Sequence, residues 1–463
     1  MRTVQFILAA LISLTPFQPA LRAQAAAPEA APKSGPPIEV RFQEYKLKNG
    51  LRVILSEDHA APTYSLCITY NVGSRDEPPG RTGFAHLFEH MMFQGSANVG
   101  KGEHSILISN NGGSSNGTTN PDRTNYYETL PANQLELGLF LEADRMRSLT
   151  ISQANFDNQR LTVQEERRQN YDNRAYGKTY EAIIDAAYDN FAYKHSAIGS
   201  MEDLNRAAVK DAAEFFKRYY APNNAVLSLV GDFKSEAALA LIKKYFEAIP
   251  AQPSSAAPDV TEPEQKGERR RTIEDAFAQT PRIDMVYKAP AGNTTDWYAL
   301  DVLGDILAPS MSSRLYRKLV KEKEIAVSVS AGPWEQRGPS LFEISVMARS
   351  NENVPEIEKI VYEELERVKS EPVSDWELEK VRKQSEHHRV ESLYSTRSRV
   401  TLLGSYAVYY NDPGLINTIQ SKVARVTKDD LQRVARTYLK ETNRTVVITL
   451  PKPKSAPVST DGK

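Results

Sequence analysis

Two histidines and a glutamate stand at metal-binding spacing within an apolar stretch at positions 83–93. His86 and His90 are four residues apart in this stretch. Four residues correspond to about 400° of helical rotation, so both imidazoles share one helix face and can hold one Zn²⁺. Glu89 lies one turn from His86, within reach of a water that the metal activates. The three residues therefore predict metal-assisted hydrolysis.

The alternative is that these are ordinary core histidines whose ring nitrogens are hydrogen-bonded. The chain contains seven histidines, and a buried histidine is more often such a residue than a ligand. However, ionisable groups in so apolar a stretch are costly unless they are paired or bind a metal. Three of them at ligand spacing favour the metal site.

A catalytic zinc site needs a third protein ligand and an open coordination position. The candidates are the neighbours Glu165 and Glu166, in the long helix predicted at 153–173. Adjacent helical residues point about 100° apart, so only one of the two can face the metal. Their spacing does not choose between them. A solvated charged face would explain the Glu-Glu-Arg-Arg run without any metal.

A peptide-binding strand is predicted close to this site. Residues 111–119 are rich in glycine and short polar side chains, and they run into the strand-like segment 123–130. The pattern indicates a turn that leads into an exposed edge strand, which could bind an extended peptide by strand addition. A surface hairpin without a binding role explains these residues equally well.

The layout of the chain indicates an internal repeat. Adding 219 to the residue number aligns Tyr219 with Tyr438 and Asn224 with Asn443, each pair just before a predicted strand. Where the first half has its His/Glu helix, the second half has no metal ligands. The predicted boundaries are 39–249 for a zinc-binding α+β domain, 250–268 for a proline-rich linker, 269–450 for a second domain, and 451–463 for a disordered tail.

The first strands are predicted from a turn signal. Asn49-Gly50 separates the strand-like segments 45–48 and 51–55. This dipeptide is typical of a hairpin with a two-residue turn.

The N-terminus is typical of a secretory signal. Arg2 precedes an apolar segment at 4–14, and small residues at 20–25 offer cleavage sites. The apolar segment is too short to span a bilayer. We therefore predict a cleaved signal peptide at 1–25 and a flexible leader at 26–38. The mature protein is expected to be exported to the periplasm, with no membrane span.

Composition narrows the class of protein. The chain has 463 residues, of which 40% are hydrophobic and 25% charged, as expected for a globular protein of two or more domains. Its formal net charge of −1 does not favour binding to nucleic acid or to an anionic membrane surface. Cys67 is the only cysteine, so an intrachain disulfide is excluded.

The remaining histidines carry weaker signals. His387 and His388 lie on a predicted charged helix and are expected to be solvated. His59 and His104 are expected at the surface. His195 lies in a predicted loop that could approach a substrate.

The motifs together resemble those of the M16 metallopeptidases, the inverted zincins also called pitrilysin or insulinase-like. Residues 83–95 resemble the family signature, and the glycines, Asn116, Arg123 and Tyr126 that follow are similar to the family's strand beside the site. The resemblance continues into the second half at 311–316 and covers nearly all of the mature chain. The length matches short two-domain members related to mitochondrial processing peptidase.

The resemblance implies a fold and a set of site residues. It implies an α+β protein of two tandem, structurally similar α/β sandwich domains, each an antiparallel sheet packed with helices, which together form half of a clamshell. It selects Glu166, in a Val-x-x-Glu pattern, as the third ligand to one Zn²⁺ per chain, beside His86 and His90, with Glu89 as the base. Peptide would then lie along Gly113, Ser114, Ser115, Asn116, Gly117 and Thr118.

Two departures from the family pattern shape the functional hypothesis. Val320 and Val327 stand where active units carry an Arg and a Tyr that polarise the scissile carbonyl, and valine cannot donate a hydrogen bond to an oxyanion. Gln159 stands where many members carry a supporting glutamate. We therefore expect a zinc endopeptidase subunit that acts on peptides or unfolded segments, in a dimer, homo- or heteromeric, with another M16-like subunit that supplies the Arg/Tyr pair. The alternatives are a non-catalytic scaffold or peptide-binding subunit, and a non-proteolytic metal hydrolase.

Overall fold

The structure is a computed structural model that describes residues 38–308 and 310–452. From Glu39 onward the described chain forms one compact unit. The signal peptide predicted at 1–25 lies outside the described residues, and so do the predicted leader and tail apart from their innermost residues.

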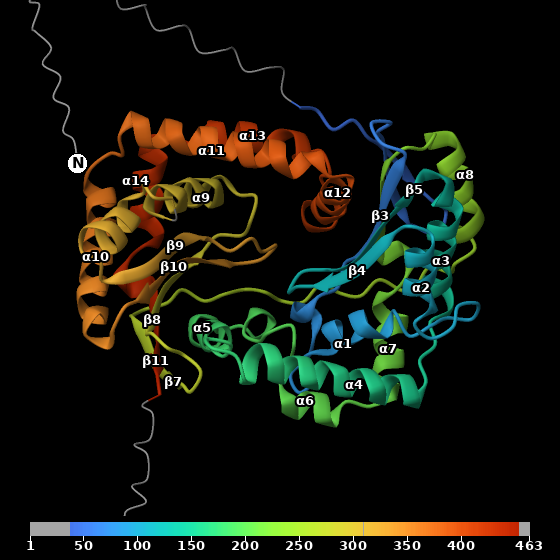
Figure 1. Cartoon of the computed structure of the whole chain (residues 1–463), viewed down its shortest axis with the longest axis horizontal. Helices are drawn as coiled ribbons and strands as arrows, with labels where there is room; N and C mark the ends of the chain where they lie inside the picture. The colour runs from blue at the N-terminus through green and yellow to red at the C-terminus, as the bar shows by residue number, and fades with distance from the viewer. Residues whose placement is uncertain (1–37, 309, 453–463) are drawn as a thin grey trace, which may run out of the picture. The chain divides into compact units, whose positions relative to one another are not determined.

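The first half contains a six-stranded sheet (Figure 1). Neighbouring strands are antiparallel except β2 and β6, which are parallel. The order is β1 (Gln43–Lys46), β2 (Arg52–Glu57), β6 (Ala225–Gly231), β3 (Thr63–Tyr70), β5 (Thr124–Pro131) and β4 (Ser114–Thr119). β4 is therefore an edge strand, as the sequence predicted.

The second half contains a five-stranded sheet with the same arrangement. Again one neighbouring pair, β7 and β11, is parallel and the others are antiparallel. The order is β7 (Arg269–Asp275), β11 (Arg444–Pro451), β8 (Arg282–Ala289), β10 (Ser340–Ala348) and β9 (Ala326–Pro333). The segment 250–268, between the two sheets in sequence, contains no helix or strand.

The internal repeat extends to individual hydrogen bonds. Adding 219 maps β3 onto β8, and α7 (Val209–Tyr219) onto α14 (Lys428–Tyr438), residue for residue. The Asn224 side-chain amide donates to the Tyr219 carbonyl at 2.9 Å, and that of Asn443 donates to the Tyr438 carbonyl at 2.7 Å. The repeat and the fold class, two tandem α/β sandwiches, are confirmed.

Helices of each half form one apolar core with their own sheet, some directly on the sheet and some through other helices. In the first half these are α1 (Phe84–Met91), α2 (Glu103–Asn110), α3 (Leu135–Ser148), α4 (Gln153–Arg167), α6 (Met201–Arg206), α7 and α8 (Ser235–Phe246). In the second half they are α9 (Thr295–Leu307), α10 (Val354–Ser370), α11 (Asp375–Tyr394), α13 (Leu415–Ala424) and α14. A π-helical turn, Arg168–Asp172, continues α4.

Two further helices are exchanged between the halves. α12 (Thr396–Tyr410) packs on β3 and β6 of the first sheet, while α5 (Thr179–Ala187) packs on β11, β7 and β8 of the second. Hydroxyl pairs join each helix to its sheet at 2.8 Å, Ser65 with Thr396 and Thr179 with Thr449. In Figure 1 α12 lies beside β3. Each half therefore buries part of its sheet under a helix of the other half.

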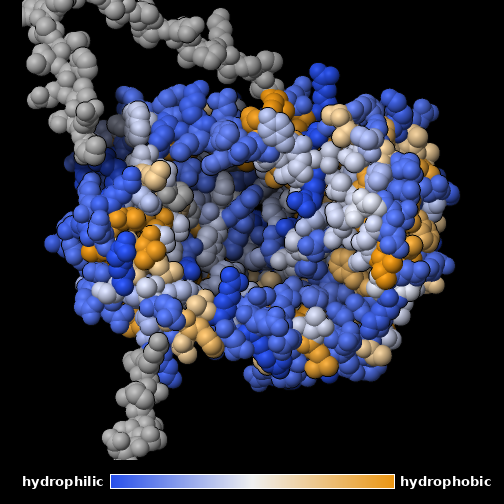
Figure 2. Space-filling view, viewed as in Figure 1, coloured by the Kyte–Doolittle hydropathy of each residue, from blue (hydrophilic) through white to orange (hydrophobic). Residues whose placement is uncertain are grey.

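The surface carries no extended apolar region on the face seen in Figure 2. That face is mostly hydrophilic and is hollowed near its middle. In the described ranges, no helix is both long and apolar enough to cross a membrane.

The turn between β1 and β2 differs from the prediction. The Gly50 N–H donates to the Leu47 carbonyl at 2.9 Å, and the Leu47 N–H donates to the Leu51 carbonyl at 2.9 Å. Three residues, 48–50, therefore form the loop, with Gly50 at a φ of +91°. The two-residue turn was wrong because the Asn49 side chain instead donates to two carbonyls at the end of α8, which holds it in the three-residue geometry.

Candidate metal centre

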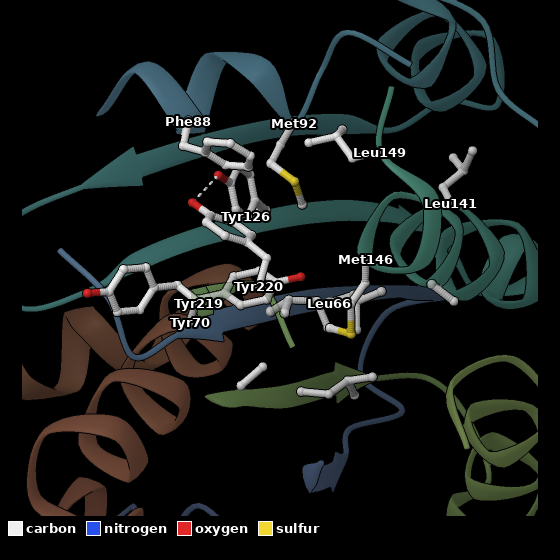
Figure 3. Close-up of a cluster of buried hydrophobic side chains, with 14 of the residues drawn as sticks. Leu66, Tyr70, Phe88, Met92, Tyr126, Leu141, Met146, Leu149, Tyr219 and Tyr220 are labelled. Carbon is white, nitrogen blue, oxygen red and sulfur yellow. Dashed lines mark hydrogen bonds between the residues drawn. The ribbon is translucent and has the colours of Figure 1, made fainter. Parts of the chain in front are cut away.

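Helix α1 has one apolar face and one face that carries the predicted chemistry. Its buried face consists of Phe84, Leu87, Phe88 and Met91. The Phe88 ring centroid lies 4.6 Å from that of Tyr220, whose hydroxyl is 3.1 Å from the Tyr126 hydroxyl (Figure 3). This packing fixes the rotation of α1 about its axis, so His86 and His90 project from the opposite face.

Helix α4 brings the third group to these histidines. The Glu166 Oε2 atom lies 3.2 Å from Nε2 of His86 and 3.2 Å from Nε2 of His90. The three side chains are 15%, 23% and 33% exposed for His86, His90 and Glu166, so the site is open on one side. Glu165 points away from this site, because its carboxylate accepts bonds from Arg168 and Gln169 at the exposed surface.

The donor set fits a catalytic zinc ion. The ligand atoms of His86, His90 and Glu166 all lie within 4.8 Å of one another. Two imidazole nitrogens and one carboxylate oxygen, converging from one side and partly exposed, match the three protein ligands and one open position of catalytic zinc sites.

Glu89 lies beside the ligands without joining them. Its Oε2 is 3.5 Å from Nδ1 of His86, and it has no hydrogen-bond partner although it is buried. Gly117 of β4 packs against this side chain, since a Cβ at that position would lie 3.0 Å from the Glu89 Cγ. A carboxylate held in this way is free to accept a proton next to the metal site.

The electrostatics of the three ligands favour a cation between them. Burial lowers the pKa of His86, but its contacts with Glu166 and Glu89 outweigh burial and raise the pKa to about 9. Hydrogen bonds from His86 and His90 lower the pKa of Glu166 far below its ordinary value, although burial opposes them. Metal ligation requires neutral imidazoles, so a zinc ion would replace the proton that His86 holds in the metal-free site.

β4 supplies the predicted peptide-binding strand. Its outer edge has no strand partner in the described part of the sheet. Side chains of Ser114 and Asn116 are exposed, whereas Gly117 faces Glu89 and is buried. The Arg123 guanidinium braces the strand by donating to the Thr118 carbonyl at 2.8 Å. The role of residues 113–118 in binding stays a prediction.

Three residues singled out by the family pattern are not among the three converging ligands. Gln159 on α4 is buried, and its amide donates to Asn158. Val320 packs against the core of the second half. Val327 lies on β9, the edge strand of the second sheet, and is 51% exposed.

One expectation about the histidines outside the site was wrong. His104 was expected at the surface but is buried in the core, where its ring stacks on Phe93. His195 lies in a loop, as predicted, with its side chain 11% exposed and 3.1 Å from Glu77, and its approach to a substrate stays a prediction. In both cases partners distant in sequence satisfy the ring nitrogen or cover the ring, which local pattern does not reveal.

A second group of possible ligands lies in the core of the first half. His104, Glu128 and Glu142 also lie within 4.8 Å of one another. Arg145, however, already bonds both oxygens of Glu142. Burial also raises the pKa of Glu128 well above its ordinary value, which favours the neutral acid. With a proton on Glu128, the charges of Glu142 and Arg145 cancel, and this buried cluster needs no metal ion.

Glu77 is a site residue that the sequence reasoning missed. Its buried carboxylate accepts the N–H groups of Gly83 at 2.9 Å and Ala85 at 2.7 Å, at the start of α1. A negative charge is stabilised near the N-terminus of a helix, where the helix dipole is positive. An acidic residue shortly before the predicted helix is therefore a signal that could have identified Glu77.

Comparison of the sequence with protein-family models identifies the family of each half. A family model described as insulinase (peptidase family M16) matches residues 52–200, and one described as the peptidase M16 inactive domain matches residues 207–385. The first match contains α1 and Glu166.

Individual relatives match along most of the chain. The zinc protease PqqE of Helicobacter pylori is 30% identical, over 89% of this chain and 93% of its own length. The crystal structure of a protease from Helicobacter pylori superposes with a TM-score of 0.84 at 30% identity, and covers 89% of this chain and 100% of that one. The periplasmic protease PqqL of Escherichia coli superposes with a TM-score of 0.74 at 20% identity, and the match spans 90% of this chain but 48% of PqqL. The chain belongs to the M16 metallopeptidase family.

Proposed function

We propose that this protein is the zinc-binding subunit of an endopeptidase that hydrolyses peptides or unfolded polypeptide segments. The observation that carries the proposal is the convergence of His86, His90 and Glu166, with a single carboxylate oxygen 3.2 Å from both imidazoles. The similarity to PqqE, a zinc protease, supports the same chemistry.

His86, His90 and Glu166 would hold one zinc ion per chain. When bound, zinc would act as a Lewis acid that acidifies a water molecule and polarises the scissile carbonyl. The carboxylates of Glu166 and Glu89 flank His86 and favour a positive charge there. The partial exposure of all three ligands leaves access for a substrate.

Glu89 would serve as the general base. Its Oε2 atom is buried and has no hydrogen-bond partner, so it can accept the proton of the attacking water at low cost. It would then pass this proton to the leaving amine. The buried face of α1 keeps the helix from rotating and so keeps Glu89 directed to the same side as the ligands.

The substrate would lie along β4 as an additional antiparallel strand. Residues 113–118 offer an unpaired strand edge, and Gly117 brings that strand into contact with Glu89. Main-chain hydrogen bonds of this kind need an extended substrate, which favours flexible peptides over folded domains.

We further propose that a second M16-like subunit completes the site. Val320 and Val327 cannot donate a hydrogen bond to the oxyanion, so an Arg/Tyr pair must come from a partner. The chain matches about half of PqqL, which is consistent with two such units acting together. The partner must then be a related chain, because a second copy would carry the same two valines.

Export to the periplasm is part of the proposal. The predicted signal peptide at 1–25 supports it, and so does the structural similarity to PqqL, a periplasmic protease. A fusion of the N-terminal segment to a reporter that is active only outside the cytoplasm would test this point.

A non-catalytic scaffold or peptide-binding subunit is the second candidate. The observation in its favour is the pair Val320 and Val327, together with the family model of an inactive domain over 207–385. Against it, a scaffold has no use for three ligand atoms and a free carboxylate brought together from α1 and α4.

The deciding experiment measures zinc content and the cleavage of a quenched, unstructured peptide. The protein is assayed alone and with M16-like chains that co-purify with it, and Glu89→Gln serves as the matched control because it leaves the ligands in place. We expect about one zinc per chain, lost in His90→Ala, and Glu89-dependent cleavage only when a partner is present. Full activity of the protein alone would refute the proposal that a partner subunit completes the site. Bound zinc without cleavage under any of these conditions would favour the scaffold.

A further inference from the structure

His195 lies in a setting that requires both of its ring nitrogens to be donors. Nδ1 is 3.0 Å from the Phe191 carbonyl, and Nε2 is 2.9 Å from the Ser74 carbonyl and 3.1 Å from Glu77 Oε2. All three partners are acceptors, and neutral imidazole has only one N–H. The contacts therefore favour the imidazolium form. Burial lowers the pKa of His195, but these bonds outweigh it and the pKa is raised.

The carboxylate that His195 contacts is the one that caps helix α1. Glu77 is fully buried, and its two oxygens accept the N–H groups of Gly83 and Ala85. An ionised carboxylate at such a site is costly unless a positive charge compensates it. His195 is the side chain that forms an ion pair with Glu77 in the described residues.

The loop that carries His195 also touches α1 through its backbone. We call residues 194–200 the strut loop. Gly83 and Gly199 have φ angles of +90° and +73°, and a Cβ on Gly199 would lie 2.4 Å from the Gly83 Cα. The Ser200 N–H donates to the Thr82 hydroxyl at 3.0 Å. The start of α1 therefore rests directly on the strut loop, and at Gly83 and Gly199 the two backbones are in contact.

The same loop is tied to the helix that supplies Glu166. Arg167, the next residue on α4, donates to the Gly199 carbonyl at 2.5 Å and to Glu181 at 2.7 Å. Ser196 of the strut loop donates to the same Glu181 at 2.6 Å. The strut loop thus contacts α1 just before His86 and contacts α4 just after Glu166.

We propose that His195 is a positioning residue for the metal site. As an imidazolium it neutralises Glu77, and with the strut loop it sets helix α1 against helix α4, which fixes the distances of His86 and His90 from Glu166. The inference rests on the proposed zinc function. Loss of the positive charge leaves Glu77 buried without compensation, so the start of α1 shifts and the ligand set loosens.

Zinc affinity tests this inference without any catalytic readout. The dissociation constant is measured by competition with a chelator for the wild type, for His195→Gln, for Glu77→Gln and for the double variant. We expect zinc binding about 10-fold weaker in His195→Gln, at the lower end of the effects of indirect metal-site partners. We expect the double variant to bind zinc more tightly than the two single losses in affinity, multiplied together, would give. The reason is that Glu77→Gln also removes the buried charge that His195→Gln leaves uncompensated.

A matched control separates positioning from general destabilisation. Asn224→Ala removes two side-chain hydrogen bonds from the same half but touches neither α1 nor the strut loop. This control is expected to leave zinc affinity unchanged. Equal weakening in Asn224→Ala and His195→Gln would overturn the inference.

The protonation state of His195 gives a second test, in which the measurement itself is made on the wild type. Nitrogen-15 labelling of the histidines should show both ring nitrogens of His195 protonated at pH 7.5, and the signal is assigned by its loss in His195→Gln. A neutral His195 would overturn the inference. Wild-type protein that binds no zinc would refute the proposed function and the inference with it, whereas zinc binding that His195→Gln leaves unchanged would refute the inference alone.

Discussion

A methyl group at position 117 should disturb Glu89, the proposed general base, without touching a proposed metal ligand. In Gly117→Ala the new Cβ would lie 3.0 Å from the Glu89 Cγ and 3.1 Å from the Tyr126 Cδ1. Contacts this short require one neighbour to move by a few tenths of an ångström. Tyr126 is fully buried and its hydroxyl pairs with Tyr220, whereas one oxygen of Glu89 has no partner. Glu89 is therefore the group that moves.

The size of the effect follows from the role of Glu89. A general base typically contributes about 10²–10⁴-fold to the rate, and a misplacement of about 1 Å can cost about 10²-fold. A smaller displacement is therefore expected to lower kcat by about 10-fold. The three ligands are not touched, so the zinc dissociation constant should stay within about threefold, below the 10–100-fold that supporting residues cost.

The assay compares steady-state peptide cleavage, with the partner subunit present, and zinc affinity by chelator competition. Gly267→Ala is the matched control, because a Cβ there meets nothing within 4 Å. If Gly117→Ala keeps the wild-type kcat, Glu89 is not the base or is not crowded by β4. If zinc affinity and kcat fall together, the strand supports the ligands rather than the base, and the reasoning fails.

Three further predictions test the ligand choice, an ion pair and the shared core. Glu166→Gln should weaken zinc binding at least 100-fold while Glu165→Gln leaves it unchanged, as measured by chelator competition; equal effects would contradict the geometry. Burial raises the pKa of Glu377, but bonds from Arg314 and Ser374 outweigh it and lower the pKa from 4.5 to about 2. After solvent screening its contribution is about 1–2 kcal/mol, which is present above pH 4.5 and is lost as the pH falls towards 2. Glu377→Gln should therefore flatten the acid limb of the unfolding free energy, and an unchanged slope would refute this. Leu403→Ala, in the fully buried part of α12, should cost about 2–5 kcal/mol and lower a single calorimetric transition of both halves; two separate transitions would argue against a shared core.

Features that depend on local pattern were predictable from the sequence. The helix around His86 and His90 could be predicted from the spacing of ionisable groups within an apolar run. Once one helix face is buried, the residues on the opposite face are determined by the helical repeat. The repeat followed from matching residues such as Asn224 and Asn443, which make the same bond in both halves. The edge strand at 114–119 followed from its small polar residues.

Features that depend on distant partners were not predictable. The spacing left Glu165 and Glu166 equivalent. The family resemblance selected Glu166, and in the structure the packing of α4 against α1 distinguishes the two. The turn at Asn49 differs because its side chain bonds to α8, about 200 residues away in sequence. The exchange of α5 and α12 has no local signature, because the apolar residues of a helix indicate that it is buried but not which of two similar sheets it covers.

The repeat explains why the metal chemistry belongs to one half. In the second half α9 packs on α11, as α1 packs on α4 in the first half, and Asp305 on α9 and Ser385 on α11 are among the polar residues there. The two residues line one pocket, so the second half keeps the arrangement of helices that forms the site in the first half. Asp301 and His388 also line this pocket, but among the described residues no three of its possible ligands lie close enough together to hold a metal ion. Zinc titration should therefore saturate at one equivalent per chain, and a second equivalent that survives in His90→Ala would show that the second half also binds metal.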